Sequence, residues 1–399
     1  MVATLANVDA ALKLDYQPVI REQLVNSWML LSQIESNTKD VEGKYAVLSL
    51  HVSRNSGVGA RAAGAALPGA GKQGYAEQRV PVTANYARIG IHGDVIEASA
   101  SDKGSFTRIL KAELDGEMTD LKSDVSRQLY NDSTKSIARC AVNSGVNEIT
   151  LTSATNIQMR QFHIGMVVDI GNVSSFNDIA DGVTITAVNR TTGTITVDGG
   201  TLTTDADDYI TRAGSEGNEL TGLREIVAAS GTLFNVAPGT VPEWVSTVDS
   251  NGGTPRTPTE DLFSKVIEDV HFESDEDINM IITSRGVRRA FVATLQSQKR
   301  FTNDVKIKGG FSAVTVAAGN VEVPLVVDND APAAQAFLLN TNRLKQHQMG
   351  SPWSFMDRDG SVLKYVTGYD QYEAVIYNYH ELTTDRRNSH GLLSDLSEA

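Results

Sequence analysis

Three glycines near the start of the chain have the spacing of a nucleotide-binding loop. Gly69, Gly71 and Gly74 satisfy the pattern G-x-G-x-x-G, which holds a dinucleotide only where it follows a strand and opens a helix. Pro68 precedes the pattern and an extended run follows it, so no helix start is expected. Lys72 fits no phosphate-loop pattern G-x-x-x-x-G-K-[ST] either. We therefore predict that this stretch binds no cofactor.

The seven histidines are scattered along the chain and form no zinc-binding pattern such as H-E-x-x-H. The nucleophile elbow G-x-S-x-G does not occur either. The sequence therefore predicts a protein that is not an enzyme and has no metal site. A pair of carboxylates brought together by folding stays open, and with it an unrecognised hydrolase. The histidines are His51, His92, His163, His271, His347, His380 and His390.

Two acidic clusters resemble calcium loops only in part. Asp205, Asp207 and Asp208 match no calcium ligand spacing, so a solvated loop is expected there. In the stretch Asp357 to Gly360, the place of the bidentate glutamate is taken by Gly368. We expect a tight hairpin turn at this point.

Composition limits the class of protein. The single cysteine, Cys140, excludes internal disulfides, and we expect it to be a small buried hydrophobic residue. With 399 residues, of which 41% are hydrophobic, the chain is long enough for two or three domains with real cores. It has no apolar run of membrane-spanning length and no secretory signal pattern, so we expect a protein made and used in the cytosol.

The formal net charge of −14 argues against wrapping of nucleic acid, because binding to phosphates needs clustered lysine and arginine. Any relation to DNA should therefore be containment. A high net charge also keeps a concentrated protein soluble until its specific contacts form.

We expect the elements of the chain to be arranged around one long helix, predicted from Ser105 to Asp132. Its apolar residues recur at spacings of four and three, which is typical of an amphipathic helix. Such a helix would span about 40 Å. Gly116 lies in its middle and should cost about 1 kcal/mol relative to alanine. The apolar stripe consists of Phe106, Leu110, Leu114, Met118, Leu121, Val125 and Leu129.

Before this helix the sequence predicts two extended parts. Residues 1–43 contain a short helical pattern from Ile20 to Ile34 with Trp28 beside it; this is either an ordinary N-terminal helix or an arm that docks on a neighbour. Residues 44–96 read as a long β-hairpin, with strands at Lys44–Arg54 and Arg79–Ile91. Its tip, Ser56–Gly74, is almost wholly glycine and alanine and has too little apolar surface to fold alone.

After the helix the pattern becomes β-rich and then mixed. Residues 145–214 should form a small antiparallel barrel or sandwich, with a hairpin turn at Arg190–Gly193. Residues 215–336 read as one α/β domain, in which Thr257, Pro258 and Glu260 form a capping box.

That α/β domain should contain a helix over Leu220–Val227, a buried strand at Met280–Thr283, a helix capped by Ser284, and a hairpin around Gly319 and Asn320. Residues 337–399 are mostly extended and end in a polar tail beyond Thr384, expected to be a surface extension.

This order of parts resembles the major capsid protein of tailed bacteriophages, which has the Hong Kong 97-type shell fold. The resemblance implies an α+β fold: residues 1–43 an N-terminal arm, 44–96 the extended loop, 97–144 the spine helix of the peripheral domain, 215–336 the axial domain and 337–399 the return to the peripheral domain. Residues 145–214 would be an inserted all-β module. The short N-terminal arm suggests a separate scaffolding protein or a trimmed product.

The resemblance also implies a function. The chain would be a structural subunit that assembles with itself into homopentamers and homohexamers of an icosahedral virus capsid, with a scaffolding protein, a portal and a cement protein as further partners. The shell would enclose double-stranded DNA without sequence-specific binding, with no cofactor and no membrane, in the virion and before assembly in the host cytoplasm. Contacts between subunits are expected on the extended loop and the N-terminal arm, at Arg61, Lys72, Tyr75, Arg79 and Trp28.

Lys72 stands where some relatives carry a lysine that crosslinks to a neighbour, and ordinary solvation or a salt bridge is the alternative. Two other functions stay open: the shell of a bacterial nanocompartment, which shares this architecture, and a glycan-binding or host-binding role of residues 145–214.

Overall fold

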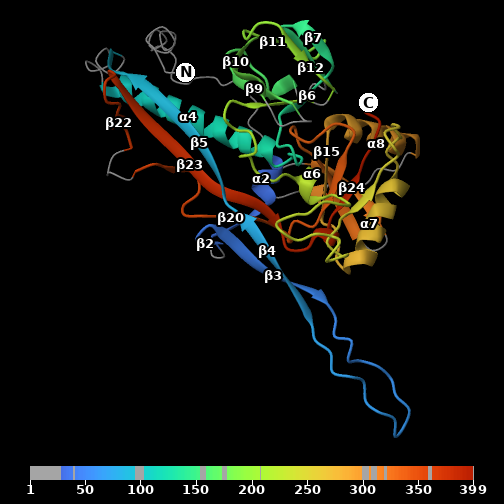
Figure 1. The fold of residues 1–399 in the computed structure, drawn as a ribbon. Helices are drawn as coiled ribbons and strands as arrows, with labels where there is room; N and C mark the ends of the chain where they lie inside the picture. Colours follow the sequence, from blue (N-terminus) through green and yellow to red (C-terminus); the bar gives the residue numbers. More distant parts are fainter. Residues whose placement is uncertain are drawn as a thin grey trace.

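The computed structural model describes residues 28–38, 41–94, 103–152, 159–172, 178–206, 208–298, 305–306, 312–318, 321–357 and 362–398. Figure 1 shows a long helix beside a long ribbon of strands, an arm of strands that projects away, a small barrel, and a sheet covered by helices. Side chains of the long helix are described from residue 113 onward.

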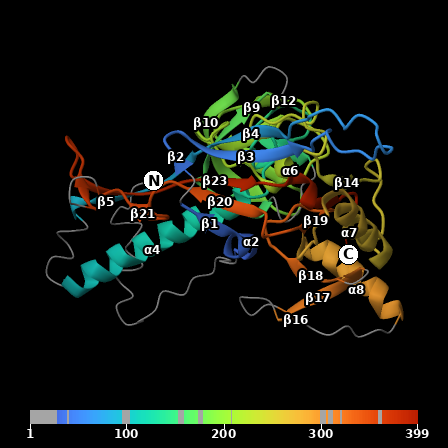
Figure 2. The ribbon, with the colours of Figure 1, turned by 90° about the horizontal axis from the view of Figure 1, so that it is seen from below.

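The long helix is α4 (Lys103–Gln128), and it lies along an antiparallel ribbon of β5 (Thr83–His92) and β23 (Gln371–Thr384). The two strands stay in register over ten pairs, from Thr83 opposite His380 to His92 opposite Gln371. Ala87 and Ile376 on the inner face of this ribbon pack with Leu121 of the helix. The ribbon and α4 therefore form one rigid unit (Figure 2).

The predicted long helix is confirmed, but it ends at Gln128 rather than at Asp132. The carbonyl of Leu129 accepts a hydrogen bond of 2.7 Å from the N–H of Leu223. The carbonyls of Arg127 and Gln128 accept from the N–H groups of Tyr130 and Asn131 in a tighter last turn, each at 3.0 Å, so these carbonyls at the buried end have partners. The members of the predicted stripe from Leu121 onward are buried, as expected.

Short strands complete the sheet along the other edge of β23. Strands β20, β21 and β22 pair antiparallel with β23, and β1 pairs parallel with β20. Helix α2 lies just before β1 and buries two residues in the main core. The bounds are α2 Met29–Gln33, β1 Glu35–Asn37, β20 Leu344–Gln348, β21 Ser354–Phe355 and β22 Lys364–Tyr365. The turn predicted at Asp359 and Gly360, like residues 1–27 of the arm, lies outside the described residues.

The projecting arm is the predicted hairpin. Strands β2 (Val41–Glu42), β3 (Tyr45–Ser53) and β4 (Gly74–Pro81) form a three-stranded sheet, and the alternation of buried and exposed residues expected for β3 is confirmed. Residues 54–73, between β3 and β4, form no helix or strand. The run predicted as one strand over Arg79–Ile91 is divided into β4 and β5 at Val82.

The inserted module is a closed barrel of six strands in the order β10-β11-β8-β6-β13-β9, with a two-stranded β7–β12 pair beside it. Its interior is filled by apolar side chains, among them Ile149, Ile170 and Ile195. The predicted turn at Arg190–Gly193 joins β10 to β11. The strands are β6 Ala138–Cys140, β7 Asn143–Val146, β8 Glu148–Thr152, β9 Val167–Gly171, β10 Asp178–Asn189, β11 Thr194–Val197, β12 Leu202–Thr204 and β13 Tyr209–Arg212.

The expected start of this module at residue 145 differs from the structure. The barrel begins at Ala138, because β6 pairs with both β8 and β13 and closes the cylinder. A strand of three residues, Ala138–Cys140, carries too weak an alternation to be recognised from sequence.

A seven-stranded sheet in the order β14-β24-β19-β15-β18-β17-β16 forms the remaining body. Helices α7 and α8 cover one face and contact each other through Phe263 and Phe291, whose ring centroids are 5.2 Å apart. The other face packs toward the spine helix, with Ile282 and Tyr130 in one core. The elements are β14 Thr247–Asp249, α7 Glu260–Ser274, β15 Met280–Thr283, α8 Arg285–Gln298, β16 Val305–Lys306, β17 Ser312–Ala318, β18 Val321–Val327, β19 Ala336–Leu339 and β24 Gly391–Leu393.

Several local predictions for this body are confirmed and two are wrong. The strand at Met280–Thr283 and the cap Ser284, whose hydroxyl accepts from the N–H of Val287 at 3.3 Å, are as predicted. The cap of α7 is Thr259, whose hydroxyl accepts from the N–H of Leu262, and not Thr257 as predicted. Two threonines flank one proline there, and Pro258 stands before the cap instead of after it.

The helix predicted over Leu220–Val227 is shorter in the structure, where α6 covers only Leu223–Ile226. The chain that follows has no long element until α7, and it is held by the C-terminal tail.

The C-terminal tail corrects a further prediction. It is not a surface extension: β24 lies inside the seven-stranded sheet, paired with β19 and β14, and Arg387 and His390 are buried. The Arg387 guanidinium donates five hydrogen bonds of 2.8–3.2 Å, all to backbone carbonyls. These carbonyls belong to Glu225, Ile226, Ser230, Gly231 and Trp244.

No helix among the described ranges is long and apolar enough to cross a membrane.

We expect Arg387→Met to lower the free energy of unfolding by about 3–5 kcal/mol, because methionine fills much of the volume but removes the guanidinium donor from all five carbonyls, of which only that of Ile226 keeps another within the described chain, the hydroxyl of Ser246. Urea unfolding measures the loss. Arg190→Met, on the exposed turn of the barrel, is the matched control and should change stability by less than about 0.5 kcal/mol. Equal stability of the two variants would contradict the role of Arg387.

Candidate assembly interface

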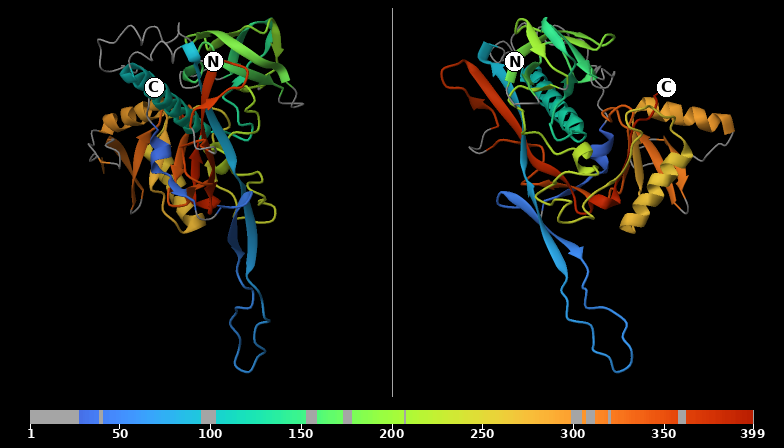
Figure 3. Two further views of the ribbon diagram at one scale, coloured as in Figure 1. Left: turned by 90° about the vertical axis from the view of Figure 1, so that its left-hand side faces the viewer. Right: turned by 45° about the vertical axis from the view of Figure 1, so that its right-hand side comes forward.

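The arm is the most exposed part of the described chain. Both views in Figure 3 show β3 and β4 leaving the body and ending in a loop that touches nothing else in the chain. Val58 is 84% exposed, Leu67 85% and Tyr75 71%. Apolar side chains this far from any core stay exposed to water when the single chain folds. Contact with another surface would bury them and so contribute favourable free energy.

The root of the arm is fixed, in contrast to its tip. The side-chain amide of Gln78, which is buried, donates to the carbonyl of Thr384 at 3.0 Å, and the N–H of Arg79 donates to the carbonyl of Phe234 at 3.1 Å. The arm therefore leaves the body in a defined direction.

Glu381 on β23 joins three segments at this root. Its carboxylate accepts from the hydroxyl of Thr83 at 2.6 Å and from the N–H of Thr221 at 2.7 Å. Thr83 is the first residue of β5, directly after the arm, and Thr221 leads into α6. Burial raises the pKa of Glu381 to about 7, although these hydrogen bonds and Lys135 lower it.

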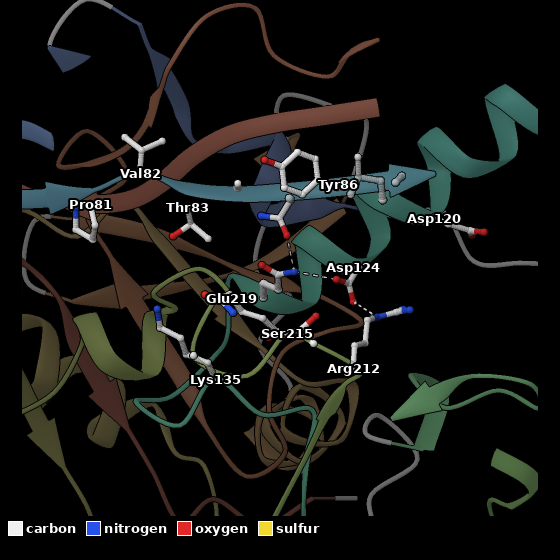
Figure 4. Close-up of a pocket in the computed structure, with 18 of the residues that line it drawn as sticks. Pro81, Val82, Thr83, Tyr86, Asp120, Asp124, Lys135, Arg212, Ser215 and Glu219 are labelled. Atoms are coloured by element: carbon white, nitrogen blue, oxygen red, sulfur yellow. Dashed lines mark hydrogen bonds and ion pairs between the residues drawn. The ribbon is translucent and has the colours of Figure 1, made fainter. Parts of the chain in front are cut away.

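A cavity of about 730 Å³ lies beside the root, between β5, the end of α4 and the segment that leaves the barrel. Figure 4 shows Thr83 and Tyr86 on one wall, Asp120 and Asp124 on the helix, and Arg212 at the exit from the barrel. The lining is mixed polar and apolar, and the part of the chain that the structure describes contains no cluster of groups that could hold a metal ion.

Charged groups beside this cavity fix the barrel to the helix. Asp124 accepts from Arg212 at 2.9 Å and from Arg127 at 3.2 Å, and Arg127 also reaches Glu219 at 2.6 Å. Burial would raise the pKa of Asp124, but the two guanidinium groups and a hydrogen bond from Gln128 outweigh it, so the pKa lies well below its usual range. The ion pair is therefore intact at any physiological pH.

A second anchor lies at the loop after β18. Asp330 accepts from Ser126 of α4 at 2.9 Å and from Gln161 of the barrel at 2.8 Å, and it is also paired with Arg160. The neighbouring Asp328 accepts from Tyr130 at 2.9 Å. These two sets of contacts fix the barrel to α4 and to the loop after β18, so its orientation is defined.

Four of the five contact residues predicted from sequence lie on the arm. Arg61, Lys72 and Tyr75 are exposed at or near its tip. Arg79 lies at its root, half exposed and paired with Glu77 at 2.7 Å. Trp28 lies apart from them: its ring stacks under the ammonium group of Lys122 of its own chain at 5.7 Å. Whether any of these residues meets another subunit stays a prediction.

The glycine pattern and the acidic loop can be compared with the structure in part. Gly69 and Gly71 lie in the tip loop and Gly74 begins strand β4, so no helix follows the glycine pattern. Asp208 corrects the expectation of a solvated loop, because it is buried and accepts from the N–H of Asp205 at 2.7 Å.

Cys140, His380 and His390 have shifted pKa values because they are buried. Cys140 is buried, and burial raises its pKa to about 12, with Asp208 adding to the effect, so the thiol is inert. Burial lowers the pKa of His380 and of His390 to about 3, and both rings are enclosed and hydrogen-bonded. These are structural roles.

Comparisons with known proteins agree with the fold described above. A family model described as SU10 major capsid protein matches residues 203–397, while no curated protein matches the sequence. The chain resembles the capsid of cyanophage A-1(L) with a TM-score of 0.57 and 12% identity, covering 95% of both chains.

Two further solved structures are similar. One is the holo-SrpI encapsulin complex from Synechococcus elongatus PCC 7942, with a TM-score of 0.50 and 11% identity over 98% of this chain and 95% of that chain. The other is the capsid of a native GTA particle, with a TM-score of 0.50 and 10% identity over 100% of both chains.

The projecting arm, the spine helix and these likenesses define the class: the chain has the α+β Hong Kong 97-type capsid fold. Within that class, the family model matches the second half of the chain and agrees with the resemblance to the major capsid proteins of tailed bacteriophages predicted from the sequence.

We expect Glu381→Gln to alter the pH dependence of stability. The folded pKa of about 7 lies above the unfolded value of 4.5, so protonation of Glu381 favours folding at low pH, and this contribution is lost as pH rises through that window. The stability of the wild type, relative to the variant, should therefore fall between pH 4.5 and 7. Urea midpoints of both proteins across this range measure the difference. The contributions of the two buried histidines cancel in this comparison, because both proteins contain them. If the stabilities of the two proteins change with pH in parallel, the raised pKa of Glu381 is refuted.

Proposed function

We propose that the chain is the self-assembling subunit of an icosahedral virus shell, that it forms pentamers and hexamers, and that the closed shell holds packaged double-stranded DNA. The arm is the observation that carries this proposal, because a two-stranded ribbon with a glycine-rich tip and exposed Val58, Leu67 and Tyr75 has no use in an isolated monomer. A loop that becomes ordered only on a neighbour couples folding to assembly.

Repetition explains how modest contacts suffice. In a shell of closed symmetry each contact occurs many times, so weak single contacts yield a stable assembly. In this proposal the arm lies across an adjacent subunit, with Arg61, Lys72, Tyr75 and Arg79 in the contact, and Trp28 holds the start of the chain against α4. A scaffolding protein, a portal and a cement protein would be further partners, and the chain itself has no catalytic role.

The charge of the chain is consistent with containment of DNA rather than recognition. With a net charge of −14, the subunit as a whole repels phosphate, so the genome would be enclosed without sequence-specific contacts. We place the protein in the virion, and in the host cytoplasm before assembly.

A nanocompartment shell is the second candidate, because the encapsulin from Synechococcus elongatus PCC 7942 shares the fold at a TM-score of 0.50. The family model favours the virus. The content of purified shells decides between them: nuclease-protected DNA supports the virus, and a single packaged protein supports the nanocompartment.

We expect replacement of residues 54–73 by Asn-Gly, a two-residue turn that fits the Ser53–Gly74 pair, to abolish closed shells while the midpoint of thermal unfolding of the monomer stays within a few degrees. Sedimentation and negative-stain microscopy measure assembly. The control variant keeps the loop length and changes Val58, Leu67 and Tyr75 to serine, which tests the apolar anchors alone. Normal shells from the shortened chain would overturn the role of the arm.

A further inference from the structure

Helices α7 and α8 form the outermost layer at the end of the molecule opposite the free ends of α4 and β5 (Figure 2). Their inner faces meet through Phe263 and Phe291 over the seven-stranded sheet. Their outer faces are exposed and differ sharply in charge.

The outer face of α7 is acidic. The helix carries five carboxylates and one lysine. Glu268, Asp269 and Glu273 are exposed, and none of them forms an ion pair within the described residues. The lysine, Lys265, is already paired with Asp249 at 2.6 Å.

The outer face of α8 is basic. The helix carries three arginines and no carboxylate. Arg285 and Arg289 are four positions apart, so they lie on one face, and both are exposed. No ion pair joins them or Arg288 to the part of the chain that the structure describes.

Phe272 lies on the acidic face and is 86% exposed, the highest value among the large hydrophobic residues. On the helical wheel it stands opposite Phe263, Val266, Ile267 and Val270, the residues that bury α7 in its core. A phenylalanine in this position adds nothing to the fold. It would add to a contact in which an arginine covers its ring.

We propose that the acidic face of α7, with Phe272 at its centre, binds the basic face of α8 of a second copy of the chain. This rests on the proposed function and names the surface that joins neighbours within a ring. Within a ring the contact is head-to-tail, with α7 of each copy against α8 of the next, and a head-to-tail contact that closes produces rings. The occupant is a second copy because each face finds its complement in charge on the same molecule.

Electrostatics also determines how neighbouring copies dock in such a ring. At physiological salt the Debye length is about 8 Å, so the net charge of −14 weakly repels distant copies while charges in contact still attract. The pairs therefore select the face and the orientation of docking more than they supply total affinity.

Charge reversal tests the proposal. The variant Glu268→Arg with Asp269→Arg makes both helices basic, and the variant Arg285→Glu with Arg289→Glu makes both acidic. Each should raise the protein concentration needed for assembly at least tenfold. A chain with all four substitutions restores complementarity and should assemble near the wild-type concentration. The control Asp181→Arg with Glu243→Arg changes the charge equally at exposed sites elsewhere and should assemble normally.

Mixing gives the sharpest outcome. In a head-to-tail ring, copies of the basic and acidic variants must alternate, so their mixture can form rings of six but not rings of five, and closed shells should be absent. Microscopy of the mixture counts the ring members.

The result separates this inference from the function on which it rests. Suppose that the wild type and the control assemble. If the two single-face variants then assemble as well as the wild type, or if the fourfold variant fails to assemble despite a normal thermal midpoint, the α7–α8 contact is wrong and the shell role stands. If the wild type remains monomeric at every concentration, also when co-expressed with its neighbouring genes, the shell role and this contact both fall.

Discussion

The pairing of β5 with β23 is the constraint on which the rest of the structure depends. Ten consecutive register pairs hold these strands together, and β23 also pairs with β20, β21 and β22 along its other edge. Because β5 follows the arm after a single residue, Val82, the position of Thr83 opposite His380 fixes where the arm begins. A slip of one residue would turn every buried side chain of the ribbon outward. The register of the ribbon is thus also the direction of the arm.

The same strand carries the constraint into the second body. After Thr384, the chain turns and buries Arg387 among backbone carbonyls before it enters the seven-stranded sheet as β24. Carbonyls are strong acceptors that must be satisfied when buried, and the described segment that follows α6 supplies only one donor to them, the hydroxyl of Ser246 to the carbonyl of Ile226 at 3.4 Å. One guanidinium from the end of the chain therefore shapes a long irregular segment near its middle.

Much of the fold could be predicted because its signals are local. The stripe of α4, the alternation in β3, the cap at Ser284 and the turn at Arg190–Gly193 each follow from spacing within a few residues.

The predictions were wrong where a partner distant in sequence determines whether a residue is buried or where an element ends. Arg387 and His390 look like a solvated tail, and only pairing of β24 with β19 makes them core residues. Asp208 is buried because the barrel closes over it. The end of α4 is set by Leu223, which is more than ninety residues away. No window of the sequence contains these partners.

The candidate interface was predicted in part for the same reason. Exposure of the arm follows from its glycine-rich composition, which is local, so Arg61, Lys72 and Tyr75 could be placed on it. Phe272 was missed, although a signal exists: its position on the wheel of α7 is opposite the residues that form the core. Helical periodicity identifies the face of the helix that is buried. An apolar residue on the opposite face is then one that core packing does not require.

The three main apolar cores are each complete within one chain, and this determines what is left for assembly. One core joins α2, the end of α4 and the inner face of the seven-stranded sheet, a second lies under α7 and α8, and a third fills the barrel. None of them needs a neighbour to exclude water. Two surfaces with exposed apolar side chains, the tip of the arm and the outer layer of α7 and α8, lie at the periphery. Assembly through such surfaces can form, break and re-form contacts while the cores stay folded, because no core residue takes part in them.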